Sequence, residues 1–142
     1  MLAIRERTLG PEPPSVATSV NNLAALYHLQ GRYAEAESLY TRTSLILEKS
    51  VGPEHIDMAS ALNNLAEVYR AQGRWEDAAP LYPRAIAIAE KALGPDHPMP
   101  AGLLENYAVV LRRARRDAEA FEIDARARDI RARHARENPR WR

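Results

Sequence analysis

Three asparagines stand 42 residues apart along the chain, at Asn22, Asn64 and Asn106. Asparagine is a mediocre helix former, because its side chain competes for backbone hydrogen bonds. Its recurrence at a fixed spacing within helical sequence therefore indicates a structural or binding role. An amide carries donor hydrogens and an acceptor oxygen, and it can pair with the main chain of an extended peptide whatever the peptide's sequence. We predict that these three side chains hold the main chain of a ligand.

A second set of amides lies one residue earlier in the same period. It consists of Asn21 and Asn63, and Glu105 takes this place in the third period. A repeating asparagine can instead tie neighbouring structural units together by satisfying backbone groups buried between helices. This role suits the second set better, because the third period replaces its amide. Both sets are candidate peptide contacts, and Asn64→Ala separates the roles: lost binding indicates a ligand contact, and lost thermal stability indicates a tie.

Charged side chains share the face that carries the asparagines. Helical spacings of three, four and seven residues place Glu67, Arg70, Arg112 and Arg113 there. Guanidinium groups bind carboxylates through charge-assisted hydrogen bonds. The arginines are therefore expected to attract an acidic segment or a terminal carboxylate, and the expected partner is a protein or peptide.

Residue types that carry catalytic or metal chemistry are scattered. The chain has no cysteine, which rules out disulfides and thiolate metal sites. His55 and His97 recur with the period in the loops PEHI and PDHP, without metal-ligand spacing, and we interpret them as loop and cap residues. No nucleophile–base pair, phosphate-binding loop or acid pair stands out. The sequence predicts no catalytic residue, no metal site and no cofactor.

A repeat that fills most of the chain supplies the elements that position these residues. Residues 9–50, 51–92 and 93–134 align without a gap, and the first two copies agree at 19 of 42 positions. Such a period is typical of a stacked array in which each unit buries its apolar face against its neighbours. The predicted organisation is the end of a preceding repeat at 1–8, repeats at 9–50, 51–92 and 93–137, and a tail at 138–142.

Each unit reads as helix, tight turn, helix and loop. In the second unit, Asp57 is expected to cap the first helix and Gly73 to form the turn. Ala66 and Ala78 are small residues where the two helices should cross closely. The third unit has Arg115 in the place of the turn glycine.

Two prolines interrupt the pattern of the second unit. Pro80 and Pro83 lie inside the helix predicted over residues 75–92, and each removes a backbone donor. We therefore expect a bend near residues 79–83.

The bulk properties exclude some function classes. No apolar run approaches the ~18–20 residues of a membrane span, and no secretory signal opens the chain, so a cytoplasmic location is expected. The net charge of +1 points to no particular partner. Arginines of the last helix interleave with acids, such as Asp124 with Arg128, which favours a salt-bridged end helix over a nucleic-acid-binding one.

The segments VNNLAALYHLQGRYAEAESLY and LNNLAEVYRAQGRWEDAAPLY resemble the tetratricopeptide repeat. The 42-residue period with its GPEH-type loop is similar to the kinesin light chain-like subclass found in bacterial arrays, rather than to the ordinary 34-residue unit. The resemblance covers residues 9–134. It implies an all-α, right-handed solenoid whose concave wall consists of the first helix of each unit and holds peptides. The last stretch resembles a closing repeat, which would place Arg142 near a true C-terminus.

The expected function is therefore non-catalytic protein–protein interaction through an extended peptide on the concave surface. An alternative is a sensor or spacer array of a larger signalling or enzymatic protein, without a ligand of its own. A third hypothesis, an RNA-binding helical repeat, predicts polyanion binding with a steep salt dependence. The sequence leaves the partner's identity and the oligomeric state open.

Overall fold

The computed structural model describes residues 13–137, and the regular structure within this range is entirely helical. The partial helix predicted at 1–8 and the tail at 138–142 lie outside the described residues. The helices are α2 (Pro14–Leu29), α3 (Tyr33–Ser50), α4 (Ile56–Ala71), α5 (Trp75–Ala78), α6 (Leu81–Leu93), α7 (Pro98–Arg113) and α8 (Asp117–Glu137).

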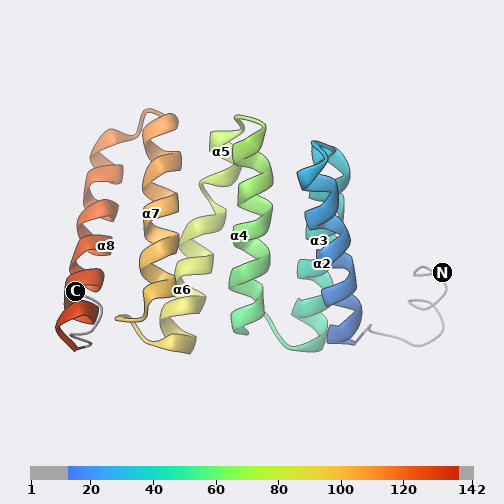
Figure 1. Cartoon of the computed structure of the whole chain (residues 1–142), viewed down its shortest axis with the longest axis horizontal. Coiled ribbons are helices and arrows are strands. Elements are labelled where there is room, and N and C mark those ends of the chain that lie inside the picture. The colour runs from blue at the N-terminus through green and yellow to red at the C-terminus, as the bar shows by residue number, and fades with distance from the viewer. Residues whose placement is uncertain (1–12, 138–142) are drawn as a thin grey trace.

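The helices form three hairpins that stand side by side in a row (Figure 1). Within the hairpins, α2 packs against α3, α4 against α5 and α6, and α7 against α8. Neighbouring hairpins join where α3 meets α4 and where α6 meets α7, so the apolar face of each unit is buried by the next. This arrangement confirms the all-α solenoid predicted from the repeat.

The tight turn of each hairpin uses one residue in the left-handed backbone region. Gly31 and Gly73 have φ angles of +77° and +71°, which glycine adopts without steric cost. Arg115 occupies the same place in the third turn and adopts φ +65°, although it carries a Cβ atom. The backbone geometry of the turn is thus kept in the third unit, and the strain falls on Arg115.

Replacing Arg115 with glycine is expected to stabilise the protein by about 0.5–1 kcal/mol, because relief of left-handed strain exceeds the extra entropy of glycine in the unfolded chain. The reciprocal change Gly73→Arg should destabilise by about 1–2 kcal/mol, and an added Cβ there meets no atom within 4 Å, so only backbone strain acts. Thermal unfolding followed by circular dichroism measures both. A fall in melting temperature for Arg115→Gly would refute this account.

The first helices of units two and three begin with a histidine cap. The Nδ1 atoms of His55 and His97 each accept a hydrogen bond of 3.1 Å, from the backbone N–H of Asp57 and Met99 respectively. The interpretation of the two histidines as cap residues is confirmed. The prediction that Asp57 caps α4 is wrong: Asp57 lies in the first turn, where its carboxylate faces the positive end of the helix dipole.

The second helix of the middle unit is in two pieces, as its prolines predict. α5 ends at Ala78, and α6 begins at Leu81 with Pro80 at its N-cap position, whereas α3 and α8 run through the same register (Figure 1). Pro83 then falls in the first turn of α6. The first N–H groups of a helix have no partner within the helix, so Pro83 is tolerated there.

Ion pairs hold α8 to the rest of the solenoid, but one pair differs from the prediction. Asp124 pairs with Arg112 of α7, across the hairpin, rather than with Arg128 one turn along α8. Three arginines of α8 also reach carboxylates outside it: Arg126 with Glu90 at 3.2 Å, Arg131 with Glu105 at 2.7 Å, and Arg133 with Asp96 at 2.7 Å. These cations are thus largely compensated by the protein itself.

Candidate functional site

Two adjoining hollows form a groove between α2 and α4, which we name the α2–α4 groove. The first, of about 190 Å³, is lined by Ala17, Thr18, Asn21, Thr43, Leu47, Asp57, Ser60, Ala61 and Asn64. The second, of about 280 Å³, is lined by Ala25, His28, Leu29, Tyr40, Asn64 and Glu67. Asn64 lines both, so it stands at the middle of the groove.

The walls of the groove come from the two first helices, and its floor comes from α3. Thr43 is the one polar residue of the described chain that is fully buried, and its hydroxyl donates to the Leu39 carbonyl at 2.9 Å. Because the Thr43 hydroxyl already donates a hydrogen bond within α3, this polar group on the floor of the groove is satisfied without a ligand. Sequence reasoning, which took candidates only from the first helices, missed Tyr40, Thr43 and Leu47. The signal was present, because Thr43 stands where the other units have Ala85 and Ala127.

The groove is crossed by one amide pair. The Asn64 side-chain nitrogen donates to the Asn21 side-chain oxygen at 3.2 Å, joining α4 to α2 in a partly buried setting. The pair therefore combines one residue from each predicted set. Each amide keeps further hydrogen-bonding capacity, since an asparagine side chain has two donor hydrogens and an oxygen with two lone pairs.

The remaining predicted amides lie elsewhere. Asn22 is exposed on α2 and lines neither hollow. Asn63 and Asn106 are half-buried, one period after Asn21 and Asn64. The equivalent bond between them is not formed, and the Asn63 side-chain oxygen is buried without a hydrogen-bond partner. The pair Asn21 and Asn64 is thus hydrogen-bonded, whereas the equivalent pair Asn63 and Asn106 is not.

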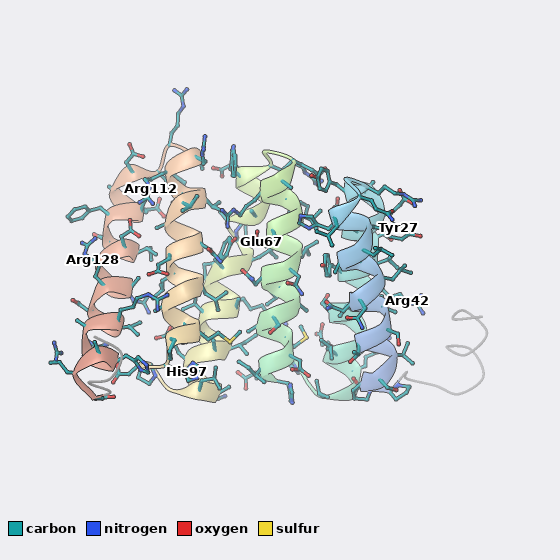
Figure 2. The ribbon with its side chains drawn as sticks, viewed as in Figure 1. Tyr27, Arg42, Glu67, His97, Arg112 and Arg128 are labelled. Carbon is teal, nitrogen blue, oxygen red and sulfur yellow. The ribbon has the colours of Figure 1, made fainter. Side chains whose placement is uncertain are left out.

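Most of the predicted arginines are already engaged by carboxylates. Arg70 donates to Glu67 of the same helix at 3.0 Å. Arg112 pairs with Asp124 of α8; Glu67 and Arg112 are labelled in Figure 2. Arg113 has no ion pair among the described residues; its guanidinium lies 5.7 Å from the centre of the Trp75 ring, in a cation–π contact. None of these three arginines lines the α2–α4 groove, whereas Glu67 does.

Glu105, which replaces the first amide in the third unit, has a partner of its own. The Arg131 guanidinium donates two hydrogen bonds of 2.7 Å to its carboxylate. These bonds hold the pKa of Glu105 below its ordinary value, with burial acting in the opposite direction. In the third unit, the residue at this position of the repeat is therefore Glu105, which joins α7 to α8 through an ion pair instead of offering an amide.

Residues 13–137 contain no group of three or more His, Asp or Glu side chains arranged to hold a metal ion. Within the same range, none of the helices is long and apolar enough to cross a membrane.

The sequence matches the family model described as the tetratricopeptide repeat over residues 2–49, 15–91 and 57–133. The chain belongs to the tetratricopeptide repeat family. Tetratricopeptide repeats typically mediate protein–protein interaction. No curated protein sequence matches the chain closely enough to count as a relative.

Solved structures place this tetratricopeptide chain near the kinesin light chain-like branch. BtubC (BKLC) from P. vanneervenii matches with a TM-score of 0.83 and 26% identity, over 94% of this chain and 53% of that one. A kinesin light chain-like protein of P. anserina with nearly identical TPR-like repeats gives 0.73 and 28%, over 84% of this chain and 56% of that one. The chain thus spans about half the length of these proteins, and the resemblance to the kinesin light chain-like subclass is confirmed.

A more distant solved structure shares the fold alone. The N-terminal domain of stress-induced protein-1 from C. elegans matches with a TM-score of 0.69 at 14% identity, over 82% of this chain and 85% of that domain.

Proposed function

We propose that the chain is a non-catalytic interaction module that binds an extended peptide segment of a partner protein in the α2–α4 groove. The observation that carries the proposal is the position of Asn64, which lines both hollows and faces Asn21 across the groove. The spare donor and acceptor capacity of this amide pair matches the N–H and C=O groups of a peptide main chain.

The size of the groove fits this ligand. From Thr18 to Leu29 on α2, the groove follows eleven residues of helix, about 16 Å. An extended strand rises about 3.3 Å per residue, so the groove accommodates about five residues. Leu29 and Ala25 at one end offer apolar contact, while Thr18 and Ser60 at the other offer hydroxyl groups.

The charges of the groove support a neutral peptide better than an acidic one. Asp57 and Glu67 line it, and Arg70 already neutralises Glu67. A carboxylate-rich segment would meet these acids without a cation to pair with inside the groove. We therefore include no acidic preference in the proposal.

Binding to a panel of immobilised peptides of varied sequence tests the proposal. Asn64→Ala should weaken the tightest binder about tenfold, the effect of a lost partly buried hydrogen bond. The matched control is Asn22→Ala, because Asn22 is an exposed asparagine of the same face that lines neither hollow. It should leave affinity unchanged.

Thermal unfolding of the same variants separates a ligand contact from a structural tie. If Asn64→Ala lowers the melting temperature while leaving peptide affinity intact, the Asn21–Asn64 pair serves to join α2 to α4, and the proposal fails. Equal losses of affinity in Asn64→Ala and Asn22→Ala would also place the ligand outside the groove.

One observation favours the alternative of a sensor or spacer array within a larger protein. Leu23 and Leu26 on the outer face of α2 are 40% and 50% exposed, whereas their counterparts one period later, Leu65 and Val68, are 8% and 0% exposed because α3 packs near them. The outer face of α2 thus exposes leucines at positions that a packed helix covers in the next unit. This alternative predicts that no peptide of the panel binds.

A further inference from the structure

The two ends of the α2–α4 groove differ in charge. In the second hollow, the Glu67 carboxylate is paired with Arg70 at 3.0 Å, so this end carries no net charge from the pair. In the first hollow, Asp57 is the one charged residue of the lining, and the polar residues beside it, such as Thr18 and Ser60, are neutral. The groove therefore offers a single negative charge at one end.

The Asp57 carboxylate has no cationic partner within residues 13–137. One of its oxygens lies 3.7 Å from the Nδ1 atom of His55. That nitrogen accepts a hydrogen bond of 3.1 Å from the backbone N–H of Asp57, so it carries no proton and the ring is neutral. The Asp57 side chain is 58% exposed, and its charge is open to a ligand.

The repeat does not require an acid at the position of Asp57. Ser15 and Met99 stand there in the first and third units, and both α2 and α7 begin without an acid in the first turn. The favourable contact of Asp57 with the helix dipole is thus one that the neighbouring units do without. The start of the helix alone does not account for this residue.

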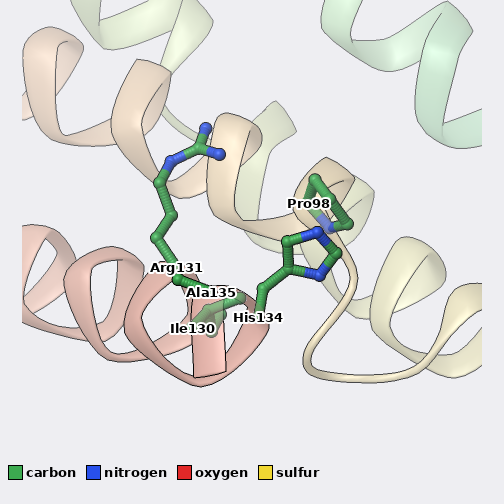
Figure 3. A pocket seen from close by; sticks show the side chains of 5 residues that line it. All are labelled: Pro98, Ile130, Arg131, His134 and Ala135. Carbon is green, nitrogen blue, oxygen red and sulfur yellow. The ribbon is translucent and has the colours of Figure 1, made fainter. Parts of the chain in front are cut away.

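A hollow at the opposite end of the solenoid shows the contrary arrangement. It lies between the end of α8 and the start of α7, has a volume of about 570 Å³, and is lined by Pro98, Ile130, Arg131, His134 and Ala135 (Figure 3). The Arg131 guanidinium donates two hydrogen bonds of 2.7 Å to Glu105, so its charge is neutralised within the protein. The charge of Asp57, by contrast, is left for a ligand.

The spacing of the groove residues sets the spacing of the ligand's side chains. Ala25 lies one period before Glu67, so ten residues of helix, about 15 Å, separate Asp57 from the level of Ala25. Four residues of extended strand span about 13 Å, and the long side chain of lysine or arginine covers the remainder. Side chains four positions apart also point to the same face of a strand.

We propose that the α2–α4 groove selects segments in which a lysine or arginine stands four positions from an apolar residue. The cation pairs with Asp57, and the apolar side chain lies on Ala25 and Leu29. The amide pair of Asn21 and Asn64 holds the main chain between them. This preference rests on the proposed peptide binding and adds to it the chemistry that distinguishes one peptide from another.

Fluorescence anisotropy with matched labelled peptides tests the preference. The peptides share one apolar residue and differ only four positions away, where they carry Lys, Gln or Glu, and each is made in both chain directions. In the better direction, the Lys peptide should bind about threefold tighter than the Gln peptide, the effect of a half-exposed ion pair, and the Glu peptide should bind least. Asp57→Asn should bring the Lys and Gln affinities together and leave the Gln affinity unchanged.

The matched control is Asp117→Asn. It makes the same substitution in the first turn of α8, where the acid is exposed, has no ion pair among the described residues and lies outside the groove. This variant should keep the threefold ratio. A purely structural role of Asp57 would instead change the affinities of all the peptides by the same factor and leave the ratio intact, which would overturn the preference.

The remaining outcomes separate the preference from peptide binding itself. Equal affinities for Lys and Gln peptides, both weakened by Asn64→Ala, would refute the preference and leave the proposed function standing. Binding by none of the peptides would remove both. Should Asp57→Asn unfold the chain, salt replaces it in the test, because screening weakens an exposed ion pair. A Lys-to-Gln ratio that falls toward one in high salt supports the pairing, and a ratio that salt leaves unchanged refutes it.

Discussion

Tyr82→Ala is expected to lower the free energy of unfolding by about 3–5 kcal/mol, the usual cost of truncating a large core aromatic. Tyr82 is fully buried, and its ring stacks on that of Tyr107 with centroids 5.6 Å apart and planes 20° from parallel. This contact joins α6 to α7, the junction between the second and third hairpins. Because each unit of a solenoid is stabilised chiefly by its neighbours, the loss should also split thermal unfolding into two transitions.

Tyr82→Phe is the matched control, since it keeps the ring and removes only the hydroxyl. Burial raises the pKa of Tyr82 to about 12, so the hydroxyl is neutral near pH 7 and its removal deletes no charge. Calorimetry should show the phenylalanine variant within about 1 kcal/mol of wild type. A Tyr82→Ala chain that unfolds in a single transition with less than about 1 kcal/mol lost would show that the junction does not depend on the stacked rings.

Ala66→Leu should destabilise the protein by about 1–3 kcal/mol through overpacking. Ala66 in α4 and Ala78 in α5 are both completely buried, and they lie in the same core cluster. Helix axes come as close as about 8 Å only where side chains at the crossing are small. A leucine at position 66 has no room to enter, so the two helices must separate.

The control for this change is Ala71→Leu, because Ala71 is exposed at the end of the same helix. It should leave the melting temperature within about a degree or two of wild type, as surface substitutions do. Chemical denaturation of both variants measures the difference. Equal stability of Ala66→Leu and wild type would mean that the crossing tolerates a wider spacing than its alanines suggest.

The sequence predicts the helical elements well because their causes are local. The turn glycines, the helical spacing of apolar residues and the two prolines each act within a few residues of the chain, and the repeat shows them more than once. The interruption before Leu81 and the caps formed by His55 and His97 follow from this local chemistry.

The candidate site was less predictable because its partners come from different helices. No local rule predicts that Asn64 of α4 pairs with Asn21 of α2, or that Arg112 of α7 pairs with Asp124 of α8. The left-handed turn at Arg115 shows the same limit: closing the tight turn between α7 and α8 requires a backbone conformation that the side chain of Arg115 disfavours. Tertiary geometry overrides local preference at each of these places.

The break between α5 and α6 lies between the hairpin of α2 and α3 and the hairpin of α7 and α8. The α2–α4 groove rests on the continuous α3, and the third hairpin contains the continuous α8, while the interrupted helix between them lacks the backbone N–H donors of Pro80 and Pro83. Proline breaks are the common origin of sharp changes in helix direction. Bending of the array should therefore concentrate at this hinge, so the pitch of the superhelix can adjust while the groove keeps its shape.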